Sequence, residues 1–360
     1  MTHKERLERL YRGEVMDRPG IYVRPLVPEN DPTYDRLVAY LREHTELKRW
    51  WSTRPVRQKL PVEAFTEPYS DDFQRQVTVL HTPAGDVRQS YLVSLTGRPG
   101  LHEEHFIKTV DDAGAFLAMP PRQYGGDVSG FFAEVADLGD AGLVEVNIDN
   151  NAAGRVVAKM GSETFALWSV QHRDLLHELI RHEQRDLLAM TRCLLDAGVG
   201  PYYSLSGQEY IVPPVHGPAD FMDFNVRYDK EVIATIHEAG GTVHVHCHGR
   251  VGKVFEGFIE MGADVVHPFE SPPLGDITAA EAKERSGGAF CLEGNIQIAN
   301  FYERTPEQIA EETAGLIADA FGDRRNLIVC PTASPYMRGA GERCFGQFKA
   351  MIDTVLNWRP

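Results

Sequence analysis

Three features that define large classes of protein are missing from this sequence. No segment approaches the roughly 18 uninterrupted apolar residues of a membrane-spanning helix, so no membrane association is expected. No Lys/Arg-rich run offsets the formal net charge of -15, so a surface that neutralises nucleic-acid phosphates is not expected either. No Gly-x-Gly-x-x-Gly fingerprint follows a predicted strand, which argues against a dinucleotide-binding domain.

Signals of export are missing as well. The N-terminal segment alternates charged residues with leucines and lacks the apolar core of a signal peptide. The five cysteines are scattered along the chain and odd in number. Without an export signal they are most simply interpreted as reduced thiols, so we expect a cytoplasmic protein.

The regular part of the chain indicates an α/β fold. From about residue 128, short apolar runs alternate with longer helical stretches. Strands are predicted over residues 20–25, 142–148, 164–169, 200–206, 242–247, 264–267, 289–293 and 327–330. Apolar strands that alternate with helices form parallel sheets covered by those helices, and eight such strands close into a barrel. We therefore predict a (β/α)₈ TIM-type barrel.

The N-terminal third is less regular. A hairpin is predicted between residues 78 and 92, with its turn at Thr82-Pro83-Ala84-Gly85-Asp86. A chain of 360 residues can form one large barrel, because such barrels routinely exceed the usual domain size. We expect one domain over residues 1–360, in which residues 30–127 form an elaboration that covers part of the barrel mouth.

Three histidines alternate along one predicted strand. His244, His246 and His248 point the same way, because residues two apart share a face of a strand. Burying them without partners would be costly. The pair His246 and His248 at the strand end could close on one cation, since imidazole is a common zinc ligand. The alternative is a set of core histidines hydrogen-bonded to carboxylates or backbone, and His244, which lies deepest, is interpreted as a supporting residue.

Two further residues are candidate metal ligands. Glu270 follows the next predicted strand, within reach of His246 and His248, where barrel enzymes place functional groups. It could equally cap the helix that begins near Thr278. Cys330, on the last predicted strand, could supply a thiolate to a soft metal or be a buried structural cysteine.

Other polar side chains also follow predicted strands. Glu209 or Asp149 could act as a general base or as a ligand. Asn147, Tyr210 and Asn295 are expected to line a substrate pocket. Each of these residues alone is more often a helix cap or a solvated loop residue. Their convergence at one end of five successive strands indicates an active site.

Several short motifs, in their order along the chain, resemble those of the uroporphyrinogen decarboxylase-like superfamily. They are Lys4-Glu5-Arg6, Arg12-Gly13-Glu14, Asp17-Arg18, the His-x-[Cys/His]-Gly turn at 246–249, Gly262-Ala263-Asp264-Val265, Pro268, Gly294-Asn295-Ile296, Thr305-Pro306-Glu307-Gln308 and Cys330-Pro331-Thr332. The resemblance covers nearly the whole chain. It implies a (β/α)₈ barrel with its site at the C-terminal mouth.

The resemblance also separates two branches of the superfamily. Its decarboxylases carry a Met-Arg-Gln-Ala-Gly-Arg motif whose arginines hold porphyrinogen carboxylates, and residues 22–27 lack that motif. Its methyltransferases of corrinoid pathways bind zinc through His-x-Cys-Gly and a later cysteine. Here His246 matches the histidine, His248 replaces the first cysteine, and Ala333 aligns with the later one. Fewer thiolates leave room for a carboxylate such as Glu270.

The resemblance therefore implies a metal-dependent methyltransferase, with zinc as the metal. It would move a methyl group between a small substrate or a corrinoid and an acceptor thiol. A decarboxylase or other lyase that acts on a carboxylated substrate in the same mouth is the main alternative. A hydrolase of the amidohydrolase type is disfavoured, because there the His-x-His motif lies on the first strand. An inert binding protein would not need the polar convergence. Any corrinoid must arrive free or on a separate protein, and a second copy of the chain is the other candidate partner.

Overall fold

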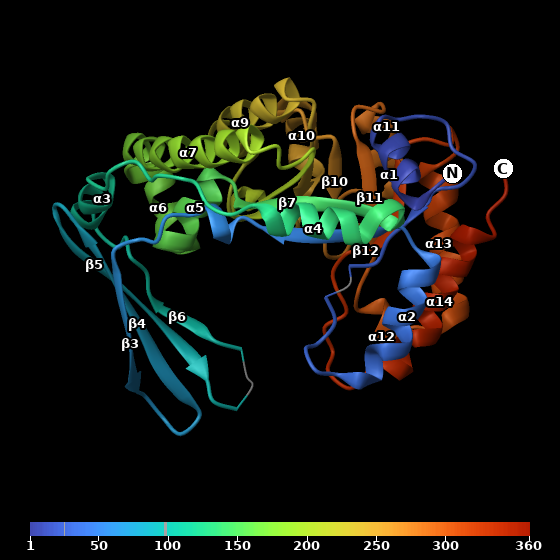
Figure 1. Ribbon diagram of the computed structural model, residues 1–360, viewed down its shortest axis with the longest axis horizontal. Helices are drawn as coiled ribbons and strands as arrows, with labels where there is room; N and C mark the ends of the chain where they lie inside the picture. The colour runs from blue at the N-terminus through green and yellow to red at the C-terminus, as the bar shows by residue number, and fades with distance from the viewer. Residues whose placement is uncertain (25, 97–98) are drawn as a thin grey trace.

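The computed structural model describes residues 1–24, 26–96 and 99–360 (Figure 1). Eight parallel strands form one sheet in the order β1-β12-β11-β10-β9-β8-β7-β2. Their bounds are β1 Gly20–Ile21, β2 Leu47–Ser52, β7 Gly142–Asn150, β8 Tyr202–Ser206, β9 Thr242–His246, β10 Val265–His267, β11 Cys291–Ile296 and β12 Leu327–Pro331. Lys48 of β2 contacts Glu293 of β11 across the interior of the sheet, and this contact shows that the sheet is curled. The predicted α/β class is confirmed.

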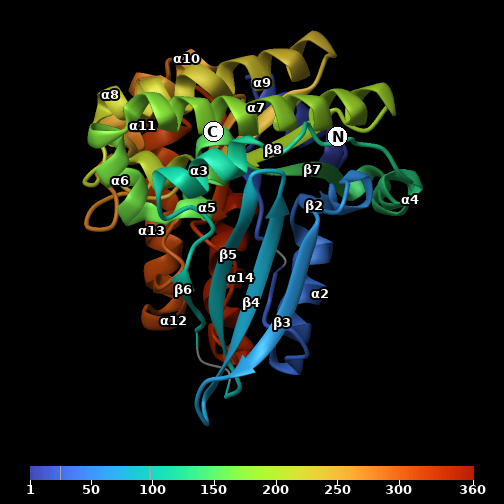
Figure 2. The ribbon, with the colours of Figure 1, turned by 90° about the vertical axis from the view of Figure 1, so that its left-hand side faces the viewer.

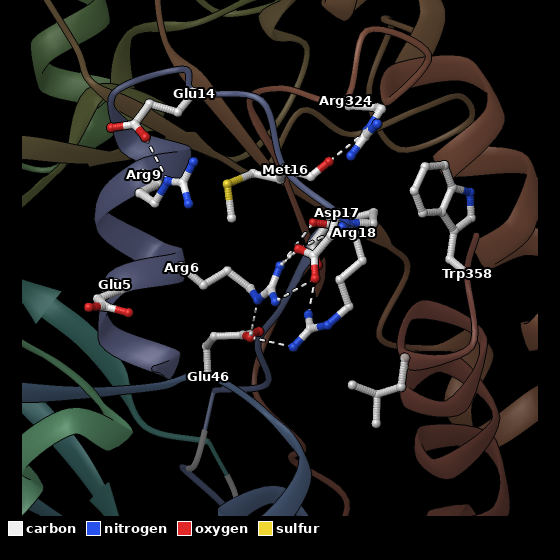
Figure 3. Close-up of polar contacts among 12 residues, drawn as sticks. Glu5, Arg6, Arg9, Glu14, Met16, Asp17, Arg18, Glu46, Arg324 and Trp358 are labelled. Carbon is white, nitrogen blue, oxygen red and sulfur yellow. Dashed lines mark hydrogen bonds and ion pairs between the residues drawn. The ribbon is translucent and has the colours of Figure 1, made fainter. Parts of the chain in front are cut away.

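The two edge strands of this sheet meet at Glu46, just before β2. The Glu46 N–H donates to Ile21 O of β1 at 3.0 Å, and the Ile21 N–H donates to the Glu46 carboxylate at 2.7 Å. Figure 3 shows Arg6 and Arg18 around the same carboxylate, at 3.3 and 2.7 Å. Since Glu46 is completely buried, these contacts join β1 to β2 and give the sheet its barrel-like form.

Helices cover the outside of the sheet (Figure 1). They are α1 His3–Tyr11, α2 Asp35–His44, α3 Val110–Leu117, α4 Ser129–Leu138, α5 Ala152–Met160, α6 Ser162–Gln171, α7 Arg173–Asp196, α8 Pro218–Asp220, α9 Arg227–Glu238, α10 Phe255–Met261, α11 Ala279–Ser286, α12 Asn300–Glu303, α13 Pro306–Ala320 and α14 Gly341–Leu356. The start of α13 illustrates how sequence fixes a boundary: Thr305 and Gln308 form a capping box around Pro306. None of the described helices combines the length and the apolar character needed to cross a membrane.

A second sheet, antiparallel, is inserted between β2 and β7. It contains β3 Val62–Pro68, β4 Phe73–Thr82, β5 Gly85–Ser94 and β6 Leu101–Glu104, in that order. The predicted hairpin is confirmed as β4 and β5, which pair from Phe73 with Ser94 to Thr82 with Gly85. We call this second sheet the arm. Figures 1 and 2 show that it projects from the barrel toward the same side as α12, which follows the C-terminal end of β11.

Two expectations about the strands are corrected. The strand predicted over residues 164–169 is wrong: these residues belong to α6, where Phe165, Trp168 and Ser169 are buried at helical spacing. A short apolar run has the same pattern in a buried strand and in a buried helix. The missing eighth strand is β2, which lies with α2 inside residues 30–127. Part of the predicted elaboration therefore belongs to the barrel, and the arm accounts for the separate part. Residue 25, the end of the first predicted strand, lies outside the described residues.

Candidate active site

A cavity of about 210 Å³ lies among the strands of the barrel. Its lining residues are Arg24, Trp50, Asn147, Ser204, Leu205, Ser206, His244 and His246. Arg24 follows β1, and the others come from β2, β7, β8 and β9. The curled sheet thus brings Arg24 to 3.3 Å from His246, although 222 positions separate them in the chain. This is the end of a parallel barrel at which functional groups gather.

His246 is held by a second histidine, His267 of β10. The two rings are stacked, with an interplanar angle of 17° and 3.0 Å between their Nδ1 atoms. His267 Nε2 lies 3.1 Å from Pro331 O, and a proton on that nitrogen would bond to the carbonyl and leave a lone pair on His267 Nδ1. In that tautomer His246 donates from Nδ1 and keeps its lone pair on Nε2. A proton on His267 Nδ1 would reverse the roles, and His246 Nδ1 would then also accept from Arg24.

The electrostatic surroundings keep both rings neutral. Burial lowers the pKa of His246 well below its ordinary value, and the charge of Arg24 lowers it further. Burial and Arg24 act on His267 in the same direction. A neutral imidazole with a free nitrogen can accept a proton or bind a metal ion.

His248 and Glu270 form the next pair along the mouth. His248 Nδ1 lies 3.3 Å from Glu270 Oε2, and the Gly249 N–H donates to the same oxygen at 2.8 Å. Gln297 donates to the other oxygen at 3.1 Å. Burial raises the pKa of Glu270, but the bonds from His248 and Gly249 outweigh it, so the pKa lies below its ordinary value. The centroids of the His246 and His248 rings are 4.7 Å apart, but in the described chain the ligand atoms of His246, His248 and Glu270 do not all lie within 4.8 Å of one another.

Cys330 lies elsewhere. Its thiol is buried behind the histidine pair, with Sγ 3.7 Å from His267 Nε2. Burial raises its pKa well above the ordinary thiol value, so it stays protonated.

Another buried group combines His244, His267 and Glu293. Within the described residues, it is the one set of three or more such side chains whose ligand atoms all lie within 4.8 Å of one another. His244 Nε2 is 3.4 Å from a carboxylate oxygen of Glu293. Lys48 already contacts that carboxylate, so the lysine ammonium supplies a positive charge to this group without a metal. His267 and Glu293 were missed from sequence, and a charged residue inside an apolar strand was the available signal for Glu293.

Beneath the cavity, Lys48 is buried between two carboxylates. Its ammonium lies 3.3 Å from Glu145 and also contacts Glu293. Burial lowers the pKa of Lys48, but the two carboxylates outweigh it and raise the pKa, so Lys48 stays charged. Glu145 also accepts a hydrogen bond from Trp50 Nε1 at 3.1 Å. The network therefore fixes the Trp50 ring that lines the cavity.

The remaining predicted residues are more dispersed. Asn147 lines the cavity, and its Oδ1 accepts from the Asp149 N–H at 2.8 Å. The Asp149 side chain is exposed and paired with Arg57 at 2.9 Å. Asn295 donates to Phe269 O and to Ser271 Oγ, so it holds the loop after β10.

Glu209 and Tyr210 lie together in the short helix Gln208–Ile211, after β8. The Glu209 carboxylate accepts from the Gly207 N–H at 3.0 Å, and burial raises its pKa. Tyr210 is 37% exposed, so its ring faces solvent in part. Neither residue is among those that line the cavity in the described chain.

Comparison with known proteins agrees with this architecture. A family model described as Uroporphyrinogen decarboxylase (URO-D) matches residues 152–334, more than half of the chain. The protein belongs to the URO-D family, and the predicted resemblance is confirmed.

The fold is also found in a solved structure. A methyltransferase from Methanosarcina mazei matches with a TM-score of 0.62 and 12% identity over 99% of this chain and 98% of that chain. A muconate lactonizing enzyme from Pseudomonas putida matches with a TM-score of 0.25 and 14% identity, covering 83% and 78% of the two chains. No curated protein sequence matches the chain.

Proposed function

We propose that this protein is a metal-dependent methyltransferase of the URO-D family that methylates an acceptor thiol at the mouth of a (β/α)₈ barrel. The observation that carries the proposal is the position of His246 in the cavity, with its Nδ1 3.0 Å from His267 Nδ1 and its ring centroid 4.7 Å from that of His248. The likeness to the Methanosarcina mazei methyltransferase over nearly the full length of both chains supports the same class of reaction.

His246, His248 and Glu270 fit a zinc ion by their chemistry. His246 is neutral, and Glu270 is favoured in its ionised form, as ligands must be. His246 Nδ1 contacts His267 Nδ1, and when His246 carries its proton on Nδ1 this contact is the arrangement that fixes a metal-binding histidine. Zinc held by these residues would lower the pKa of a bound thiol and make it a nucleophilic thiolate. Cys330 is not included in this set, because its Sγ contacts His267 Nε2 at 3.7 Å and Pro331 O at 3.3 Å instead of these three residues.

The proton of the thiol needs an acceptor. Glu209 suits this role better than Asp149, because burial raises its pKa whereas Asp149 is paired with Arg57. In the proposed step the thiol gives its proton to the Glu209 carboxylate. The sulfur then forms a bond to the methyl carbon as the bond from that carbon to the donor breaks, and the donor keeps the electron pair.

The methyl donor must be presented at the rim, because a corrinoid is far larger than a cavity of about 210 Å³. Exposed apolar side chains lie on loops that follow four of the barrel strands. They are Leu26, Tyr210, Val215, Leu274 and Tyr336. Such residues would suit contact with a separate protein that carries the donor.

A decarboxylase is the second candidate, and Arg24 is the observation that favours it. A guanidinium in the cavity could hold the carboxylate of a substrate that loses carbon dioxide. In that case carbon dioxide would be released without any methyl donor.

The test is metal content and methyl transfer by the purified full chain. Wild-type protein should hold about one zinc ion per chain and should demethylate methylcobalamin in the presence of an acceptor thiol. The double variant His246→Ala, His248→Ala should lose both properties. The control is His237→Ala, which removes a partly exposed histidine of α9 that is paired with Asp264. This variant should keep both the zinc ion and the methyl transfer. Methyl transfer that persists in the double variant, or in wild type stripped of metal, would overturn the proposal.

A further inference from the structure

The two edge strands of the barrel sheet are joined only in part. In the described chain β1 pairs with β12 and β2 pairs with β7, and no ladder connects β1 to β2. A backbone hydrogen bond from the Glu46 N–H to Ile21 O holds the strands together just before β2 begins. Beyond this bond the two strands form an open boundary in the wall of the barrel, which we call the seam.

A second cavity, of about 310 Å³, lies at the seam between α2 and α4. Most of its wall is apolar and is formed by Tyr22, Val23, Val38, Leu41, Leu47, Leu138 and Ala141. We call it the seam cavity, and it shares no lining residue with the cavity of the candidate active site. Mainly apolar cavities of about 300 Å³ or more are typical sites for small molecules. At about 30 Å³ per water molecule, this volume equals that of roughly ten waters.

The charged side chains of the seam cavity carry a net positive charge. They are Arg42, Lys48, Arg49 and Asp137. Asp137 is paired with Arg49 at 2.5 Å, and Lys48 is held by the two buried carboxylates of the barrel interior. Arg42, in the last turn of α2, is exposed, and no hydrogen bond or ion pair joins it to another described residue. One cation at the rim is therefore available to a ligand.

An apolar cavity with one unpaired cation at its rim is complementary to a molecule that has an apolar body and a single negative charge at one end. The two parts contribute unequally to binding. An ion pair with the exposed Arg42 forms in water, where such pairs contribute little. Burial of apolar surface supplies most of the binding free energy, so affinity should depend mainly on the length of the apolar body.

We propose that the seam cavity binds a small amphipathic carboxylic acid of about ten non-hydrogen atoms. Its apolar chain lies between α2 and α4, and its carboxylate pairs with Arg42. The bound acid contacts Tyr22, which follows β1, and Leu47 of β2, so it bridges the seam. This site is separate from the proposed function and depends neither on a metal nor on methyl transfer.

Lys48 connects the seam cavity to the candidate active site. It lines the seam cavity, and its ammonium lies 3.3 Å from Glu145. Glu145 accepts a hydrogen bond from Trp50, which lines the other cavity. A ligand that changes the position of Lys48 therefore changes the surroundings of the Trp50 indole through two buried contacts.

Calorimetric titration of the full-length protein with octanoate tests this binding. One octanoate per chain should bind. Hexanoate and butyrate should bind progressively more weakly, by roughly fourfold for each methylene removed, because each methylene is buried in the cavity. Octanamide has the same shape without the charge and should bind roughly two- to fivefold more weakly than octanoate, the range expected for an exposed ion pair.

Two substitutions separate the apolar wall from the cation. Ala141→Trp fills the cavity and should weaken octanoate binding at least about tenfold. Arg42→Gln should weaken octanoate binding roughly two- to fivefold and leave octanamide binding unchanged, because only octanoate carries a charge.

The matched controls are Ala314→Trp on α13 and Arg192→Gln on α7, both at exposed positions outside the seam cavity. Both should bind octanoate within about twofold of wild type. Octanoate binding that is unaffected by Ala141→Trp, or that does not depend on chain length, would overturn the inference. If Ala141→Trp does not fold, the chain-length series on wild type and the comparison of octanoate with octanamide in Arg42→Gln decide the question.

NMR of the tryptophan indole groups tests the connection to the active site. The Trp50 indole N–H resonance should shift when octanoate binds, and the Trp358 resonance is the control, because Trp358 lines neither cavity. A Trp50 resonance that stays in place while octanoate binds would refute the connection through Lys48.

Discussion

Lys48 of β2 contacts Glu293 of β11 across the interior of the curled sheet, and Glu145 lies 3.3 Å from the same ammonium. All three side chains are completely or almost completely buried. Removing one member of a buried ion pair leaves the other charge unpaired, which typically costs about 3–5 kcal/mol.

Lys48→Met should therefore destabilise the protein by about 3–5 kcal/mol, measured as the free energy of unfolding in urea. Lys349→Met is the control, because Lys349 is 46% exposed and paired with Asp353 one helical turn away. Its loss should change stability by no more than about 0.5 kcal/mol. Equal effects of the two variants would show that the buried network does not stabilise the barrel.

Asp229 should make stability depend on pH. Burial raises its pKa from 3.8 to about 7, and hydrogen bonds from Gln208 and Asn151 oppose this only in part. Because the pKa in the folded state is above that in the unfolded state, folding favours the protonated form. Its stabilising contribution is complete below about pH 4 and is lost as pH rises toward 7. Asp229→Asn, which cannot ionise, should remove this dependence.

The measurement is urea unfolding of wild type and Asp229→Asn at pH 5 and pH 8. Between these values, the advantage of the variant should grow by an amount of order 2–3 kcal/mol, at about 1.4 kcal/mol per pH unit over the titrating range. A difference between the two proteins that stays constant with pH would contradict the assignment. Asp323→Asn, at an exposed turn, should show no such trend.

Glu46 should control the junction of β1 and β2. Glu46→Ala removes the acceptor of the Ile21 N–H and leaves Arg6 and Arg18 without this carboxylate. We expect a loss of about 2–4 kcal/mol in unfolding free energy and faster hydrogen exchange at the Ile21 amide. Glu14→Ala removes a partly exposed carboxylate from Arg9 and Arg12 and is the control. Unchanged exchange at Ile21 in Glu46→Ala would refute the role of this contact.

His267 should act on His246 through its proton. His267→Phe keeps a buried ring but cannot accept from His246 Nδ1, so the proton of His246 is free to move to Nε2. Zinc affinity should fall by about 10- to 100-fold, the usual effect of losing the partner of a metal-binding histidine. Nitrogen NMR of the imidazole rings reports the tautomer of His246 directly. If the variant changes stability but leaves the tautomer and the zinc affinity unchanged, His267 only fills space.

The sequence is most informative where local pattern and tertiary packing agree. The apolar strands β9, β10, β11 and β12 can be predicted from the sequence, because the residues of each strand all belong to one buried sheet. The strand end at His246 and His248 is found for the same reason. By contrast, β2 contains Lys48 and Arg49, and nothing local shows that Lys48 turns inward to meet two carboxylates from distant strands.

The site is only partly predictable for a similar reason. Residues 22–27 lack the decarboxylase motif, and the position of Arg24 in the cavity, without a carboxylate partner among the described residues, becomes visible only in three dimensions. His267 lies in an apolar strand, and its role depends on the direction of two protons. The sequence predicts the strand that contains Cys330, but the strand position does not reveal that the thiol lies against His267.

The arm has a packing arrangement of its own. Leu80 and Val87 belong to an apolar cluster with Phe116 and Val156, separate from the cluster that fills the barrel. The chain leaves the barrel after β2 and rejoins it at β7, the neighbouring strand. Mutation can therefore lengthen, shorten or replace the hairpins without disturbing the pairing of any barrel strand. A change confined to the arm thus alters what approaches the mouth while the reacting groups keep their positions.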